Sequence, residues 1–388
     1  MSRPSILLAG GGTGGHVFPL IAVADALTLL APELQLVFVG TERGMEVTLV
    51  PERGYALELV RVSPIRGGGV RGAVRGVWRA MMSIPESRAL LAKYGPRAVL
   101  SIGGYAAGPI SLATRLARVP LALIEPNSVM GLANRLTAPL VQRAYVAFPQ
   151  AATHFGRGTA LTTGVPIRGG FEPRAYGKRG GSIEVLVLGG SQGAKSLNET
   201  IPEALARTRA EIRVTHQCGA AHAAAVRATY ERLAPGFEWQ IVPFIQDVPA
   251  ALAASDLVIS RSGASAVSEI AAVGRPALFV PYPHAAGDHQ RHNAETLARA
   301  GAAVSVASNE ATAARLATEI ERLASDPGLL ASMAEAASHW GKPNAAREIA
   351  RDLLELAGLA PAGHQPSRAA SKAKRPDDGA NKLLEVAG

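Results

Sequence analysis

Residues 6–27 read ILLAGGGTGGHVFPLIAVADAL, and this stretch decides the fold. An apolar run typical of a strand is followed by five glycines and a threonine, and then by apolar residues at helical spacing. A strand, a glycine-rich turn and a helix start together form an anion site, because the unpaired N–H groups and the helix dipole point the same way. Glycine also lets a phosphate or a sugar approach the backbone closely.

The same order returns in residues 183–201, IEVLVLGGSQGAKSLNETI, where Gly190 holds the place of Gly12. Around both stretches, strand-like runs such as residues 98–104 and 239–245 alternate with helical patterns. Most of these runs are apolar throughout, which is typical of parallel strands covered by helices on both faces. The sequence therefore predicts an α/β protein with two Rossmann-like, doubly wound domains in tandem.

Changes in composition mark the expected boundaries. Residues 164–182 are rich in glycine, proline and charge, which is typical of a linker. We expect an N-terminal domain over residues 1–164 and a C-terminal domain over residues 165–340. An amphipathic helix should occupy residues 341–358 and dock on the body, and residues 359–388 should form a disordered basic tail.

The totals exclude several classes of protein. The 388 residues contain no run of about 18 apolar residues, so no transmembrane helix is expected. The single cysteine, Cys218, excludes an internal disulfide and is typical of a reducing compartment. A net charge of +9 favours nucleic acid, nucleotide phosphates or anionic lipid as a partner, or serves solubility alone. Nucleic acid is the least favoured, because no basic strand carries base-stacking aromatic residues.

His16 lies in the first turn of the first predicted helix. The helix dipole there disfavours the imidazolium, so the ring should remain neutral and able to accept a proton from a substrate hydroxyl. The alternative is a histidine that only caps or packs. A dinucleotide site is a weak reading of this turn, because Glu42 follows Gly40 and Thr41 instead of closing the second strand.

Candidate ligand-binding residues of the second half lie on a helix start and a strand end. Residues 262–265 open a helix whose N-terminus can meet a diphosphate. Glu269, in the first two turns, can accept from both hydroxyls of a ribose, or can be a solvated helix carboxylate. Phe244 and Ile245 can pack on a base and offer backbone groups to its edge.

A metal site is not expected. Residues 284–292 cluster three histidines and Asp288, but no further ligand set at zinc-like spacing follows. Gln290 and Asn293 in the same region suit hydrogen bonding better.

Seven stretches of the sequence, in the same order along the chain, resemble the motifs of a known family. They are GGGTGGHVFP (10–19), SIGGYAAGP (101–109), EPNSVMGLANR (125–135), GVPIR (164–168), LGGSQGAKSLN (188–198), RSGASAVSEIAAVGRPALFVPYP (261–283) and DHQRHNA (288–294). Together they closely resemble the MurG family of bacterial N-acetylglucosaminyltransferases, which make lipid II of peptidoglycan. The resemblance runs from about residue 5 to about residue 358.

The resemblance implies a GT-B fold whose final helix crosses back to the N-terminal domain. UDP-N-acetylglucosamine would bind mainly to the C-terminal domain. The acceptor would be lipid I, undecaprenyl-pyrophosphoryl-MurNAc-pentapeptide, whose C4 hydroxyl attacks the anomeric carbon with inversion. No cofactor and no metal are implied.

The resemblance also implies binding roles, residue by residue. On the sugar side of the cleft it implies Thr13, Gly14, Gly15, Asn127 and Gln290. For the nucleotide and its diphosphate it implies Arg168, Ser191, Phe244, Ile245, Ala264, Ser265, Ala266, Val267, Ser268 and Glu269.

The chain departs from the family pattern at three positions. Ile124 and Pro126 replace a histidine and a glutamine that the family often carries, and Val165 replaces an asparagine. The chain therefore has no candidate base at position 124. His16 becomes the preferred general base and Glu125 the second candidate.

A membrane-facing segment is expected in residues 66–93. Arg71, Arg75 and Arg79 share one face of a predicted helix, beside apolar residues that include Trp78. This pattern favours peripheral attachment to anionic phospholipid on the cytoplasmic face of the bacterial inner membrane, although a solvated basic face explains it too. Other proteins of cell-wall synthesis and division are further possible partners.

Three other functions compete with the transferase. A UDP-N-acetylglucosamine 2-epimerase would use the same architecture, with more acid and base groups in its cleft. A noncatalytic membrane-bound scaffold would keep a vestigial nucleotide site. An NAD oxidoreductase is remote, because it has no use for the SGASAVSE segment of residues 262–269.

Overall fold

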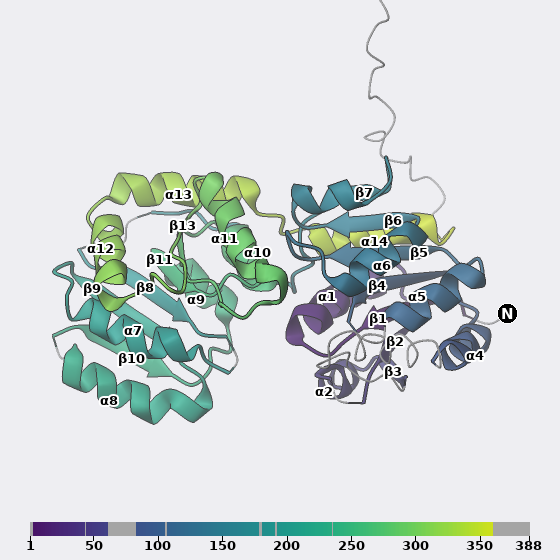
Figure 1. Ribbon diagram of the computed structural model, residues 1–388, viewed down its shortest axis with the longest axis horizontal. Coiled ribbons are helices and arrows are strands. Elements are labelled where there is room, and N and C mark those ends of the chain that lie inside the picture. The colour runs from purple at the N-terminus through teal and green to yellow at the C-terminus, as the bar shows by residue number, and fades with distance from the viewer. Residues whose placement is uncertain are drawn as a thin grey trace, which may run out of the picture.

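Two parallel sheets organise the chain, one in each half. In the computed structural model the placement of residues 3–42, 44–60, 83–104, 107–177, 181–190, 192–234 and 236–359 is described. Figure 1 shows the sheets in two separate lobes, with the beginning of the chain in one and its middle in the other. The predicted segment around Arg71, Arg75 and Arg79, the residue Ser191 and the tail from residue 360 lie outside the described residues.

The first sheet has the order β3-β2-β1-β4-β5-β6-β7, and every neighbouring pair is parallel. Its strands are β1 (Ser5–Gly10), β2 (Gln35–Gly40), β3 (Ala56–Leu59), β4 (Ala98–Gly103), β5 (Leu121–Glu125), β6 (Arg143–Val146) and β7 (Ala160–Thr162). The chain therefore winds outward from β1 in both directions, so the strand order reverses between β1 and β4, where open α/β sheets commonly bind ligands.

The second sheet repeats this winding in the order β10-β9-β8-β11-β12-β13, again all parallel. Its strands are β8 (Ile183–Leu188), β9 (Ile212–Gln217), β10 (Glu238–Val242), β11 (Leu257–Ser260), β12 (Ala277–Phe279) and β13 (Ala303–Ser305). The predicted fold class, two doubly wound domains, is confirmed.

The strand predicted over residues 239–245 is too long. β10 ends at Val242, because the next residue, Pro243, has no N–H to donate to a neighbouring strand. Phe244 and Ile245 therefore lie in the loop after the strand.

Helices cover both faces of each sheet. In the first half they are α1 (Gly14–Leu30), α2 (Glu46–Glu52), α4 (Ile84–Tyr94), α5 (Ala107–Leu116), α6 (Leu132–Thr137), η1 (Ala138–Leu140) and η2 (Pro149–His154). In the second half they are α7 (Lys195–Leu205), η3 (Ala220–His222), α8 (Ala223–Leu233), α9 (Val248–Ala254), α10 (Ala264–Val273), η4 (Ala286–Asp288), α11 (His289–Arg299), α12 (Ala313–Ala324), α13 (Pro327–Trp340) and α14 (Ala345–Leu356).

Alternate residues of one strand serve different cores. Ile6 and Leu8 of β1 pack in a buried cluster with α1, whereas Leu7 and Ala9 pack with α4 and α5 on the other face. This period of two explains why the strand is apolar at every position. None of the helices in the described part of the chain combines the length and apolar character needed to cross a bilayer.

The last helix belongs to the first lobe. Ile349 and Leu353 of α14 are fully buried in the cluster that contains β1 and α1. Asp352 accepts from Arg143 Nε at 2.8 Å and from Tyr145 Oη at 2.7 Å, which fixes α14 to β6. Figure 1 shows the chain crossing from α13 in the C-terminal lobe to α14, in yellow, in the N-terminal lobe.

Candidate active site

The first glycine turn places two backbone donors at the start of α1. Thr13 is the N-cap, and its carbonyl accepts from the N–H groups of His16 and Val17 at 3.0 and 3.1 Å. Gly14 and Gly15 come before the first intrahelical bond, so their N–H groups can donate to a ligand. Thr13 and Gly15 are exposed, which leaves this edge accessible.

His16 is held in one tautomer. Its Nδ1 lies 3.2 Å from the Gly11 carbonyl oxygen, and because a carbonyl only accepts, Nδ1 carries the proton. Nε2 of the neutral ring then bears the lone pair. Burial lowers the pKa of His16 below its usual value, against the raising effects of the Gly11 carbonyl and Glu46, and His289 of α11 lowers it further. The ring is therefore a neutral proton acceptor at the turn.

Glu125, at the end of β5, faces inward. The residue is 1% exposed, and its carboxylate accepts from Asn127 N at 2.9 Å and from Asn134 Nδ2 at 2.8 Å. Burial raises the pKa of Glu125 to about 7, and these hydrogen bonds act in the opposite direction. The carboxylate thus orders the loop that carries Asn127.

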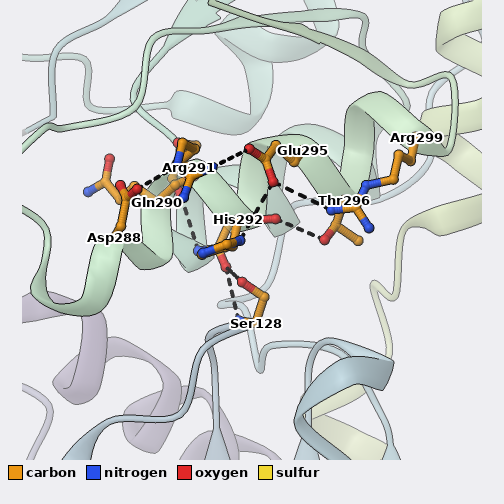
Figure 2. A network of polar contacts seen from close by, with 10 residues as sticks. Ser128, Asp288, Gln290, Arg291, His292, Glu295, Thr296 and Arg299 are labelled. Atoms are coloured by element: carbon orange, nitrogen blue, oxygen red, sulfur yellow. Dashed lines mark hydrogen bonds and ion pairs between the residues drawn. The ribbon is translucent and has the colours of Figure 1, made fainter. Parts of the chain in front are cut away.

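One buried amide joins the two domains. Asn293 of α11 is fully buried, and its Oδ1 accepts from Ser128 N at 3.0 Å and from Ser128 Oγ at 2.8 Å. Its Nδ2 donates to Asn127 Oδ1 at 3.3 Å and to the Ser262 carbonyl at 3.2 Å. Figure 2 shows Ser128 reaching toward α11 from the opposite domain. The loop after β5 and the start of α10 are therefore fixed to the same side chain.

The N-terminus of α10 carries unpaired hydroxyl groups. Gly263 is the N-cap, in an extended conformation, and α10 contacts α1 across the domain boundary. The Oγ atoms of Ser265 and Ser268 are buried and have no hydrogen-bond partner among the described residues. Buried hydroxyl groups are normally paired, so an orphan pair in the first two turns suits a ligand with acceptor oxygens.

The predicted ribose carboxylate is flanked by the linker. Burial raises the pKa of Glu269 to about 7, and the charge of Arg168 opposes that rise. The Arg168 guanidinium lies 5.5 Å from the centre of the Phe171 ring. The structure thus brings Arg168, in the segment between the domains, close to the helix that carries Glu269.

The predicted base-binding loop is connected to the second glycine turn. Ile245 N donates to Gln217 Oε1 at 3.2 Å, and Gln217 Nε2 donates to the Gly190 carbonyl at 2.8 Å. Phe244 is 49% exposed and can cover a base. Because the Ile245 N–H already donates to Gln217, the carbonyl of Ile245 is the backbone group that can bind a ligand.

Gln290 lies beside the start of α10. Its Oε1 accepts from Tyr282 N at 3.0 Å, and its carbonyl accepts from Ser262 Oγ at 2.7 Å. A Cβ added at Gly263 would lie 3.9 Å from Gln290 Nε2. The amide of Gln290 therefore borders the surface where α10 begins.

The histidine-rich segment forms ion pairs instead of a metal cluster. Asp288 pairs with Arg291, and Glu295 pairs with Arg291 Nη1 at 2.9 Å and lies 3.6 Å from His292 Nδ1 (Figure 2). Across the described ranges, no three histidine, cysteine, aspartate or glutamate residues are grouped to hold a metal ion.

Three residues of the site were not predicted in these roles from the sequence. They are Glu46, which accepts from Gly12 N at 2.7 Å, the domain-bridging Asn293, and Gln217. Glu46 follows the second strand, where Glu42 was weighed as an acidic residue, but no local pattern distinguishes the two. Gln217 has no local signal of its own, and the sequence around Asn293 suggests hydrogen bonding but not that its partners lie in the other domain.

Comparison with known proteins decides the family. The N-terminal domain of glycosyltransferase family 28 matches residues 6–146, and the C-terminal domain of the same family matches residues 184–353. The chain belongs to glycosyltransferase family 28. It is therefore a glycosyltransferase. The first matched span lies within the N-terminal lobe, and the second covers the C-terminal lobe and continues into α14.

Two curated proteins are similar to most of the chain. A protein of Sorangium cellulosum named UDP-N-acetylglucosamine–N-acetylmuramyl-(pentapeptide) pyrophosphoryl-undecaprenol N-acetylglucosamine transferase is 52% identical, over 91% of this chain and 88% of its own. A protein of the same name from Nitrosococcus oceani is 42% identical, over 91% of this chain and 98% of its own.

Solved structures agree on the family 28 architecture. The crystal structure of Acinetobacter baumannii MurG is 31% identical, with a TM-score of 0.78 over 91% of this chain and 99% of that one. A putative UDP-N-acetylglucosamine 2-epimerase from Listeria monocytogenes is 16% identical, with a TM-score of 0.65 over 91% of this chain and 96% of that one. At that identity the epimerase shares the fold alone.

Proposed function

We propose that this chain transfers N-acetylglucosamine from UDP-N-acetylglucosamine to the C4 hydroxyl of undecaprenyl-pyrophosphoryl-MurNAc-pentapeptide, lipid I, giving lipid II. The observation that carries the proposal is the contact between α1 and α10, which brings a neutral histidine and an anion-binding helix start to one domain boundary. The names of the relatives, at 52% and 42% identity, supply the substrates.

The donor is held by the C-terminal domain. The diphosphate lies at the start of α10, where the N–H groups of residues 264–266, the helix dipole and Ser265 Oγ stabilise its charge. Glu269 accepts from the ribose hydroxyls, and Arg168 and Ser191 contribute to the nucleotide site. Phe244 and Ile245 bind the uracil. Ala264, Ala266, Val267 and Ser268 form the rest of this segment.

The sugar faces the N-terminal domain. Thr13, Gly14, Gly15, Asn127 and Gln290 border it. Asn127 is fixed from both sides, by Glu125 through its backbone N–H and by Asn293 through its Oδ1. The glycines keep bulky side chains away from the place where the two substrates meet.

Transfer is a single inverting displacement. His16 Nε2 takes the proton of the acceptor hydroxyl as its oxygen bonds to the anomeric carbon. The bond between that carbon and the phosphate oxygen breaks, and UDP leaves with the electron pair toward α10. His16 is a better placed base than Glu125, because both oxygens of Glu125 already accept and its side chain is buried.

A transfer assay tests the proposal. Purified protein is incubated with labelled UDP-N-acetylglucosamine and a short-chain lipid I analogue. We expect label in a disaccharide product and release of UDP. Release of the free 2-epimer would favour the epimerase, and binding without either product would favour a noncatalytic scaffold.

Because the acceptor is a lipid, the protein needs a membrane-binding surface. The exposed side chains of α5 and α6 provide one. Leu112 and Leu116 of α5 and Leu132 and Leu136 of α6 are exposed, on two helices that contact each other. Exposed Arg115, Arg118 and Arg135 lie on the same two helices and the turn after α5. Apolar residues among basic ones favour peripheral attachment to anionic phospholipid, on the cytoplasmic face of the bacterial inner membrane.

Vesicle sedimentation tests this surface. We expect Leu132→Glu combined with Leu136→Glu to weaken binding to phosphatidylglycerol vesicles, and Arg71→Glu with Arg75→Glu and Arg79→Glu to do the same. Leu29→Glu, at another exposed leucine, is the matched control and should bind normally. Unchanged binding of both sets of variants would end the proposal.

A further inference from the structure

A buried carboxylate lies behind the first glycine turn. Glu46, at the start of α2, is 1% exposed. Its Oε2 accepts from Gly12 N at 2.7 Å, and its Oε1 accepts from Thr41 N at 2.9 Å and from Thr41 Oγ1 at 3.0 Å. Both oxygens therefore act as acceptors, and one of them is aimed at the turn that precedes α1.

The surrounding backbone is shaped to admit this side chain. A Cβ added at Gly11, Gly40 or Gly44 would overlap the Glu46 side chain. Three glycines from two segments thus leave room for one carboxylate. Its position is fixed by packing as well as by hydrogen bonds.

One peptide group connects Glu46 to His16. The N–H of the Gly11–Gly12 peptide donates to Glu46 Oε2, and the carbonyl of the same peptide lies 3.2 Å from His16 Nδ1, from which it accepts. Hydrogen bonds at the two ends of an amide polarise one another, by roughly 10–30% per bond. A negative charge at the N–H end therefore makes the carbonyl a stronger acceptor for the imidazole proton.

We infer that Glu46 is a positioning residue for proton transfer: acting through the Gly11–Gly12 peptide, it holds His16 in the tautomer whose Nε2 accepts the proton and increases the basicity of that nitrogen. The inference rests on the proposed function, in which His16 is the base. Two ionisable groups face the ring from neighbouring elements, Glu46 of α2 and His289 of α11, and they act on its pKa in opposite directions.

Glu46 raises the pKa of His16, so its neutralisation should lower that pKa further. The acid limb of the plot of kcat against pH then moves to lower pH, and the plateau falls because the base is weaker. A purely structural role in the turn would weaken donor binding as well.

Glu46→Gln removes the charge and keeps an oxygen that can accept from Gly12 N. Its control is Glu58→Gln, at a carboxylate paired with Lys93 away from the turn. Histidine-labelled protein is titrated by NMR without substrates, and kcat and donor affinity are measured separately. For Glu46→Gln we expect the pKa of His16 to fall by about half a unit or more and kcat to fall roughly three- to tenfold. Donor affinity should stay within about twofold, and Glu58→Gln should match the wild type.

An unchanged pKa of His16 in folded Glu46→Gln overturns the inference, and so does a loss of donor affinity equal to the loss of kcat. If that variant does not fold, the ¹⁵N shifts of the wild-type ring decide. Protonated Nδ1 in the neutral ring supports the inference, and protonated Nε2 contradicts it. Because the titrations use no substrate, a wild type that gives these results but transfers no sugar contradicts the proposed function alone.

Discussion

The two glycine turns occupy the same place in their domains, but hydrogen bonds of opposite direction hold them. Gly12 and Gly190 follow equivalent strands, with φ angles of +92° and +77°. The first turn is held by a carboxylate, since Gly12 N donates to Glu46 at 2.7 Å. The second is held by an amide, since Gln217 Nε2 donates to the Gly190 carbonyl at 2.8 Å.

This difference matches the charges that each turn would meet. The second turn carries Ser191, which the proposed function assigns to the nucleotide site, and a buried carboxylate there would repel the anionic donor. At the first turn a proton arrives on His16, and a nearby negative charge stabilises the imidazolium that forms. One fold, used twice, is thus adapted to two tasks by the residue that supports each turn.

The largest expected effect comes from removing the base at the first turn. His16→Ala should lower kcat about 10²- to 10⁴-fold, because general base catalysis is lost, and leave the dissociation constant of UDP-N-acetylglucosamine within about twofold. Steady-state kinetics and calorimetry separate the two quantities. The exposed His154→Ala is the control. A comparable loss of donor affinity would mean that His16 binds the donor instead.

Placing a carboxylate at the second turn, as Glu46 is placed at the first, should weaken donor binding. At pH 8.5, where a new carboxylate ionises, Gln217→Glu should raise the donor dissociation constant about 10- to 100-fold, by repulsion and by loss of the bond to Gly190. Gln217→Met loses this bond and the one from Ile245 N without adding charge, so its smaller effect measures the loss of hydrogen bonds alone. Equal effects of the two variants would remove the electrostatic distinction between the turns.

Donor binding should depend on pH through Glu269. The pKa of this carboxyl is raised to about 7 by burial, and the ionised form accepts from ribose hydroxyls. The dissociation constant should therefore rise as pH falls through 7, by about tenfold between pH 8 and pH 6. Calorimetry over this range measures it, and Glu269→Gln should bind more weakly at pH 8 with a flat profile. A flat wild-type profile would exclude Glu269 from the ribose site.

The smallest effect concerns the contact between the domains that carry the turns. Ser128→Ala removes the 2.8 Å bond to Asn293 but keeps the backbone bond at 3.0 Å, a loss of about 1 kcal/mol. Amide hydrogen exchange in residues 126–131 should accelerate about fivefold, because local opening becomes easier. Ser332→Ala, at an exposed serine of α13, should leave that segment unchanged. Unchanged exchange in Ser128→Ala would show that the side-chain bond does not hold the loop.

Local patterns were sufficient to predict much of this molecule. Strands apolar at every position and glycine turns before helices are short-range features, and they predicted both domains, His16 at the first turn and the start of α10. The end of β10 was missed although Pro243 marks it, because the apolar pattern continued past it.

The supporting residues depend on long-range packing. Glu46 lies 34 residues from Gly12 along the chain, and Asn293 lies 165 residues from Ser128. Which of Glu42 and Glu46 enters the turn depends on how α2 packs against β2, β3 and α1, and no spacing rule encodes that. Asn293 was recognised as suited to hydrogen bonding, but its partners lie in the other domain.

A structure of the complex with UDP-N-acetylglucosamine would show whether the donor lies between the start of α10 and His16. We expect diphosphate oxygens within hydrogen-bond distance of Ser265 Oγ and the first N–H groups of α10, with the anomeric carbon facing His16 Nε2 across the space that the acceptor enters. A diphosphate bound at the N–H groups of Gly14 and Gly15, with the sugar turned away from His16, would contradict it.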